Sequence, residues 1–111
     1  IQPSPDTRID GWDACSGYYY DDNTINGFSH THVSGTGCCD YGDVLLMPTV
    51  GKPQYLTTDP EAELVYASAF SHENETAEPG YYSVFLDTYQ VKAEITATKR
   101  GAIHRYTSPK A

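Results

Sequence analysis

The residues best suited to chemistry gather in one stretch of this chain, residues 10–43. It contains the only tryptophan, Trp12, two of the four histidines, His30 and His32, all three cysteines and most of the nine glycines. Few of its apolar residues have helix or strand spacing. A long polar, aromatic and glycine-rich segment is typical of ordered loops at a functional site. We therefore expect binding loops here.

A metal site is the first chemistry to weigh, because His30, His32, Cys38 and Cys39 are all ligand types for zinc. On an extended segment, two histidines two residues apart point to opposite faces, so both bind one ion only in a bent loop. Structural zinc sites usually separate their cysteines by two to four residues, whereas these two are adjacent. The spacing favours polar loop residues bonded to the backbone over a zinc site.

Sugar binding fits the pair Trp12 and Asp13 better. The apolar face of a pyranose ring stacks on an indole, and a carboxylate accepts hydrogen bonds from sugar hydroxyls. A tryptophan more often belongs to a core, but the neighbouring Gly11 favours a surface loop. Hydrolysis would require two facing carboxylates. The sequence does not select such a pair among the loop carboxylates, for which turn and cap roles are the simpler reading: Asp13, Asp21, Asp22, Asp40, Asp43, Glu73 and Glu75.

Composition excludes two classes of partner. The chain has 111 residues, a net charge of −8 and a pI of about 4.7. Lysine and arginine are too few and scattered for nucleic acid or an anionic membrane surface. Ten tyrosines in an acidic chain suit a neutral polar ligand, although tyrosine is also a common strand residue.

The three cysteines cannot form a complete disulfide framework. A bridge from Cys15 to Cys38 or Cys39 is one alternative, and free buried thiols are the other. No apolar run reaches membrane-spanning length and no signal peptide pattern is present. We expect both ends of the chain to be cuts through a longer protein.

The elements that must position these loops are strands. The N-terminal residues 1–10 should be extended, residues 18–20 a short strand, and residues 21–23 a turn. The apolar run 44–47 predicts a buried strand, residues 64–70 another strand, and residues 71–80 a loop.

The last third of the chain has the clearest pattern. Residues 81–86 are rich in strand formers, and apolar residues alternate with polar ones over 91–98. Residues 99–101 predict a turn, and residues 102–107 a returning strand. No long stretch has helical spacing. The chain is therefore expected to be all-β, a β-sandwich or a fragment of one with long ordered loops.

Several motifs together resemble glycoside hydrolase family 92, the calcium-dependent exo-acting α-mannosidases, many of them from Bacteroidetes. The resemblance extends nearly end to end and is weakest over 51–63. Its most specific part is the string FSHTHVSGTGC over 28–38. The other segments are SPDT (4–7), GWDACSGY (11–18), YGDVLLMP (41–48), FSHENE (70–75), PGYYSV (79–84) and HRY (104–106).

The resemblance implies a larger enzyme, with an N-terminal β-sandwich and a C-terminal (α/α)6 barrel. Residues 1–111 would be part of the N-terminal sandwich domain. The catalytic acid, the catalytic base and the calcium ligands would lie on the helical domain, which is absent here. No catalytic or metal-binding residue is therefore assigned to this chain. Inverting hydrolysis would place two carboxylates about 6.5–9.5 Å apart, with a water between them.

The resemblance also implies roles for four residues here. Trp12, Asp13, His30 and His32 are expected to contact the substrate, with the two histidines alternatively fixing the domain interface. The parent would be an α-1,2-mannosidase acting on mannan or N-glycan ends, located in the periplasm, secreted or on the outer surface of a bacterium. Its partners would be a mannose-containing glycan and the helical domain, and this fragment alone would be inactive.

Two alternatives remain open. The chain could be a stand-alone carbohydrate-binding β-sandwich module, which would bind mannose by itself. It could instead be a structural domain whose loops only brace a neighbouring domain.

Overall fold

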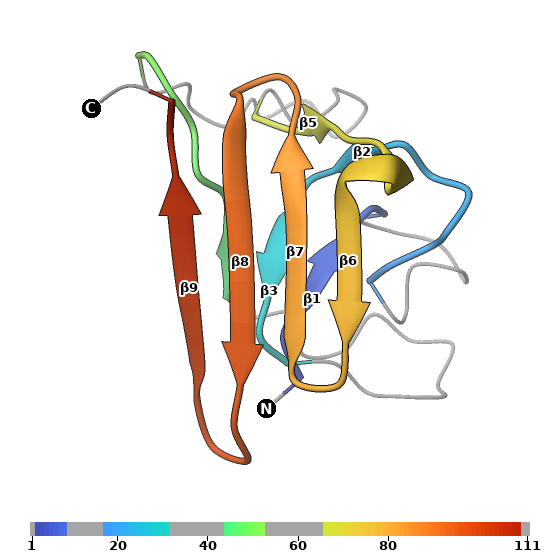
Figure 1. The fold of residues 1–111 in the computed structure, drawn as a ribbon, viewed down its shortest axis with the longest axis vertical. Helices are drawn as coiled ribbons and strands as arrows, with labels where there is room; N and C mark the ends of the chain where they lie inside the picture. The colour runs from blue at the N-terminus through green and yellow to red at the C-terminus, as the bar shows by residue number, and fades with distance from the viewer. Residues whose placement is uncertain (1, 9–16, 32–43, 53–65, 110–111) are drawn as a thin grey trace.

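The computed structural model describes residues 2–8, 17–31, 44–52 and 66–109. Apart from one 3-10 turn at His72–Asn74, the regular structure within these ranges is all strand. The predicted all-β class is confirmed. A large antiparallel sheet lies in front of a small one, as Figure 1 shows.

The large sheet is a meander of four strands in the order β6-β7-β8-β9. The strands are β6 (Glu75–Glu78), β7 (Tyr81–Leu86), β8 (Val91–Ala97) and β9 (Ala102–Thr107). The predicted alternation in β8 is confirmed, since Val91, Ala93 and Ile95 are buried. Glu94 on the opposite face is also buried, and Arg105 offsets the cost of burying its charge by donating to both carboxylate oxygens at 2.8 and 3.0 Å.

Two smaller sheets complete the fold. One has the order β1-β3-β4, with β1 at Ser4–Asp6, β3 at Gly27–Ser29 and β4 at Leu45–Leu46. The other pairs β2 (Thr24–Ile25) with β5 (Ser68–Ala69). Pro5 lacks a backbone N–H, which is tolerated because β1 lies at the edge of its sheet.

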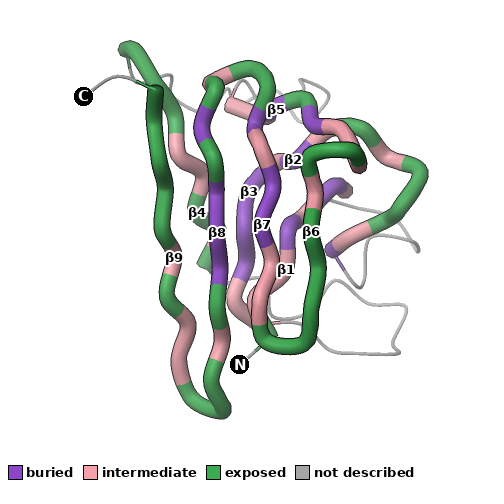
Figure 2. Tube along the Cα trace, viewed as in Figure 1, coloured by how far each residue is buried: buried purple, intermediate pink, exposed green. Residues whose placement is uncertain are grey.

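The core lies between the two layers, where Figure 2 shows the buried parts of β3, β7 and β8. Ile25 and Phe28 from the N-terminal half are fully buried. Each contributes about 1.5–3 kcal/mol through removal of apolar surface from water. They form one cluster with Phe70, which follows β5, and with four residues of the large sheet: Val84, Leu86, Ala93 and Ile95.

Two strand predictions in the first half are corrected. Residues 18–20 form no strand and end in a turn at Tyr20. The Tyr18 hydroxyl instead donates to Glu75, and the Tyr20 ring stacks on His72. The apolar run 44–47 contains only the two-residue β4, and Leu46 is 40% exposed because β4 is an edge strand.

Two predictions for residues 64–80 are also corrected. Residues 71–80, expected as a loop, contain the 3-10 turn and the whole of β6, which pairs with β7 from Glu75↔Val84 to Glu78↔Tyr81. The pattern hid this strand because an exposed edge strand has no apolar alternation. In the predicted strand 64–70, only Ser68–Ala69 is a strand among the described residues.

Candidate functional site

The segment that carries Trp12 and Asp13, residues 9–16, lies outside the described residues. Its two flanks are described, and they are bonded to each other. The Thr7 amide donates to the Gly17 carbonyl at 2.7 Å, and the Tyr19 amide donates to Thr7 Oγ1 at 2.8 Å. These hydrogen bonds hold the two flanks of residues 9–16 side by side, and we call Thr7, Gly17 and Tyr19 the closed base.

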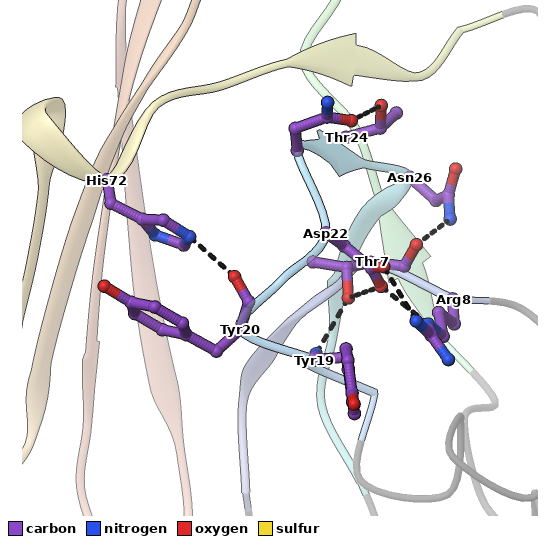
Figure 3. A network of polar contacts seen from close by, with 9 residues as sticks. Thr7, Arg8, Tyr19, Tyr20, Asp22, Thr24, Asn26 and His72 are labelled. Atoms are coloured by element: carbon purple, nitrogen blue, oxygen red, sulfur yellow. Dashed lines mark hydrogen bonds and ion pairs between the residues drawn. The ribbon is translucent and has the colours of Figure 1, made fainter.

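A salt bridge strengthens this base, as Figure 3 shows. Arg8 donates to both carboxylate oxygens of Asp22, through Nε at 2.8 Å and Nη2 at 3.0 Å. The Thr7 hydroxyl donates to the same carboxylate at 2.8 Å, and the Arg8 guanidinium lies 4.0 Å from the Tyr19 ring centroid. The hydrogen bond from Arg8 is the main cause of the lowered pKa of Asp22. The pairing holds this carboxylate in its charged form.

Of the two predicted histidines, His32 lies outside the described residues and His30 follows β3. The Nε2 atom of His30 lies 2.7 Å from the Nε2 atom of His104 on β9, and His104 Nδ1 lies 2.8 Å from the Tyr106 hydroxyl. One ring must offer N–H and the other a lone pair, so at least one of the two is neutral. This row of rings joins the two sheets.

Electrostatics agree with that arrangement. Burial lowers the pKa of His104, and the neighbouring His30 lowers it further. With Nε2 of His30 directed at His104, this atom braces the sheets. A contact between His30 and substrate would therefore use another part of the ring or the backbone.

The two loop segments leave the small sheet at opposite ends. Residues 9–16 follow the end of β1 at Asp6, and residues 32–43 follow the end of β3 at Ser29. In the antiparallel register Asp6 pairs with Gly27 and Ser4 with Ser29. The bases of the two predicted binding loops are therefore separated by the length of β1.

Glu75, which the sequence indicates only as one of several loop carboxylates, is the centre of a polar cluster. Tyr18 donates to Glu75 Oε1 at 2.9 Å, His72 Nδ1 lies 2.8 Å from the same oxygen, and Tyr82 donates to Oε2 at 2.5 Å. Burial is the main cause of the raised pKa of both tyrosines, with the Glu75 hydrogen bond second. Both hydroxyls therefore remain donors at neutral pH. The sequence signal that could have pointed to this cluster is that Tyr82 lies on the same face of β7 as Val84 and Leu86.

Both ring nitrogens of His72 are hydrogen-bonded, and two aromatic rings pack against it. Its Nε2 donates to the Tyr20 carbonyl at 2.6 Å (Figure 3), and its Nδ1 faces the Glu75 carboxylate. The Tyr20 ring stacks on it with centroids 4.1 Å apart and planes 3° apart, while the Phe70 ring lies edge-on at 5.3 Å. The hydrogen bond to Glu75 is the main cause of the raised pKa of His72. Two acceptors on two nitrogens favour the imidazolium.

Three of the described carboxylates are already bonded by protein donors. Asp22 is bonded by Arg8, Glu94 is bonded by Arg105, and Glu75 accepts from two tyrosine hydroxyls. In the described ranges, no three His, Cys, Asp or Glu side chains converge as metal ligands. Calcium prefers six to eight oxygen ligands, and these oxygens already serve protein donors.

A cleft of about 550 Å³ opens beside the Glu75 cluster. It lies between the segment leading into β1 and the strands β6, β7 and β8. Apolar groups form most of its wall, with tyrosines and carboxylates among them. This size is within the range of small-molecule sites.

The described strands form an all-β, sandwich-like fragment with a cleft beside the Glu75 cluster. No helix in the described part of the chain is long and apolar enough to span a membrane. The sequence profile of the Glycosyl hydrolase family 92 N-terminal domain matches residues 1–111. The chain belongs to this family, which confirms the resemblance drawn from its motifs.

Solved structures and a further relative agree. Two structures of a family GH92 α-mannosidase from Bacteroides thetaiotaomicron, one in complex with mannoimidazole, are similar to this chain. Each is 43% identical with a TM-score of 0.86, over 100% of this chain and 15% of that chain. A protein of Arthroderma benhamiae named "uncharacterized secreted glycosidase" is 26% identical over 102 residues, 91% of this chain and 13% of that protein. The chain thus spans a small part of the length of these relatives.

Proposed function

We propose that this chain is part of the N-terminal domain of an exo-acting α-mannosidase that removes terminal α-mannosyl units with inversion. One observation carries the proposal: the 43% identity and TM-score of 0.86 over the whole chain to a GH92 α-mannosidase. The preferred substrates are α-1,2-linked mannosides of mannan or of N-glycan ends. The activity belongs to the full-length protein, and residues 1–111 alone are inactive.

The catalytic work is assigned to a C-terminal helical domain of the same polypeptide. Inversion uses one carboxylic acid to protonate the leaving oxygen and one carboxylate to activate a water on the opposite face of the sugar. Among the described carboxylates, Asp22, Glu75 and Glu94 are poor candidates for either role, because protein donors occupy them. Calcium is assigned to the helical domain as the family resemblance implies.

This chain's part is to shape the glycone pocket. Trp12 stacks on the apolar face of mannose, and Asp13 accepts from its hydroxyls. The closed base formed by Thr7, Gly17 and Tyr19 supports this role, since it anchors both ends of the segment that holds them. His30 and His32 begin the second loop, which starts at the other end of β1 and in this proposal extends to line or brace the same region.

We place the protein outside the cytoplasm of a bacterium, in the periplasm, at the outer surface or secreted. The relative named as secreted supports export, and the Bacteroides relative supports a bacterial source.

The test is hydrolysis of 4-nitrophenyl α-mannoside and of α-1,2-mannobiose by the full-length protein, with and without a calcium chelator. We expect activity that chelation abolishes and calcium restores, with β-mannose as the first product by NMR. Activity that survives chelation would remove calcium from the proposal, and an α product would remove inversion.

A stand-alone carbohydrate-binding module is the rival function. Full-length protein without hydrolytic activity would favour it, if mannose also saturably quenches the fluorescence of Trp12, the sole tryptophan, in the isolated residues 1–111. Wild-type activity of the Trp12→Ala variant would instead favour a purely structural domain.

A further inference from the structure

The cleft beside the Glu75 cluster contains an aromatic ring held ready for a ligand. Tyr20 lines the cleft and is 65% exposed, yet its ring is fixed by parallel stacking on His72. His72 is fixed in turn by Glu75 and by the Tyr20 carbonyl. An exposed aromatic side chain usually loses conformational freedom when a ligand binds, and here much of that freedom is already lost.

One face of the Tyr20 ring stacks on His72. Tyr20 lines the cleft, whereas His72 does not. Pro3, Pro5 and Ile95 form apolar wall of the same cleft. A flat ring beside an apolar wall suits a ligand that itself has an apolar face.

The charges of the cleft disfavour an anion, because Glu75 and Glu78 line it and its described lining contains no lysine or arginine. Glu75 already accepts from the hydroxyls of Tyr18 and Tyr82, so its oxygens are less available to a ligand. Glu78 is exposed and offers its carboxylate to hydroxyl donors.

We propose that this cleft is a carbohydrate-binding subsite in which an uncharged sugar unit stacks on Tyr20 and donates hydroxyl hydrogen bonds to Glu78. It is separate from the glycone pocket assigned to Trp12 and holds a more distant unit of an extended glycan. That the sugar is part of a mannan chain rests on the proposed function, whereas the sugar class rests on the cleft itself.

The experiment compares short and long substrates in the full-length protein. For Tyr20→Ala, we expect kcat/KM on 4-nitrophenyl α-mannoside to stay within about twofold, and KM on α-mannan to rise about five- to tenfold. Tyr20→Phe keeps the ring and should behave as wild type. Ile103→Ala, on an exposed side chain of β9 outside the cleft, is the surface control.

Because Tyr20→Ala also removes the ring that stacks on His72, a second variant obstructs the cleft and keeps this stack. Ala77 is exposed on the edge strand β6 and lines the cleft, so Ala77→Arg obstructs the cleft without touching the core. It should reproduce the KM change on mannan. Equal KM values for wild type, Tyr20→Ala and Ala77→Arg on mannan would overturn the subsite.

Binding is measured separately by retardation in gels that contain α-mannan. Retardation that both variants lose supports the subsite even if the protein hydrolyses no mannoside, in which case only the proposed function fails. Retardation unchanged by either variant overturns the subsite and leaves the proposed function intact. Retardation suppressed by choline instead of mannose would show a cation site and overturn the sugar assignment.

Discussion

His30 and His104 lie 74 residues apart in the sequence, yet their Nε2 atoms are 2.7 Å apart in the fold. The contact joins the end of β3 to β9 and therefore links the small sheet to the large one. Since two protonated rings cannot share this geometry, the link depends on pH.

Acid should weaken this link. The pKa of His104 is lowered by burial and by His30, so the unfolded chain binds a proton more tightly than the folded chain does. The contribution is complete above the ordinary histidine value of about 6.5 and is lost as pH falls through the lowered pKa. Hydrogen exchange of β9 amides from about pH 5 to about pH 8 should show this loss. His104→Phe should abolish the acid-dependent step, and an unchanged step would refute it.

His72 should behave in the opposite sense. Its pKa is raised chiefly by the hydrogen bond to Glu75, so the folded chain holds the proton more tightly. Its contribution is complete below the ordinary histidine value and is lost as pH rises through the raised pKa. We expect exchange of β6 amides to accelerate above that pKa in the wild type. In His72→Gln the alkaline acceleration should disappear, and its persistence would assign it to another group.

The Tyr82 hydroxyl should stabilise the fold through Glu75. Tyr82→Phe removes a bond of 2.5 Å to a carboxylate whose side chain is only 10% exposed. We expect a loss of about 1.5 kcal/mol in the free energy of unfolding, measured by guanidinium titration. Tyr81→Phe is the matched control on the same strand: Arg105 Nη2 still donates to the Glu94 oxygen that Tyr81 contacts, whereas Tyr18 and His72 contact the other oxygen of Glu75, so the loss should be smaller. Equal losses would contradict the special role of Glu75.

Gly80 should resist substitution. It follows Pro79 in the turn between β6 and β7 and has φ of +80°, a region that side chains disfavour. Gly80→Ala should cost about 1–2 kcal/mol from backbone strain alone, since an added Cβ would meet only the Ala97 carbonyl at 3.9 Å. Gly101→Ala, where φ is not positive, should be close to neutral. Melting temperatures of the two variants decide the point.

Loss of the indole should impair the proposed mannosidase. For Trp12→Ala in the full-length protein, we expect kcat/KM on 4-nitrophenyl α-mannoside to fall at least about tenfold, because stacking and positioning are both lost. Trp12→Phe should recover part of the activity. A wild-type rate for Trp12→Ala would remove this residue from the pocket.

The sequence by itself determined the local features. Alternation over 91–98 predicted β8 because one face of that strand is buried and the other wet, and the turn at 99–101 predicted its partner β9. The motif string around His30 was specific enough to identify the family, which the profile match confirms. These features depend on neighbours along the chain, so a linear pattern carries them.

The tertiary structure alone decided the long-range pairs. Strand β6 has no apolar alternation, because an edge strand buries neither face, and only its pairing with β7 defines it. The contacts of His104 with His30, and of Tyr18 with Glu75, join elements distant in sequence. Burial and register create these partnerships, and neither is encoded by the spacing of residues along one segment.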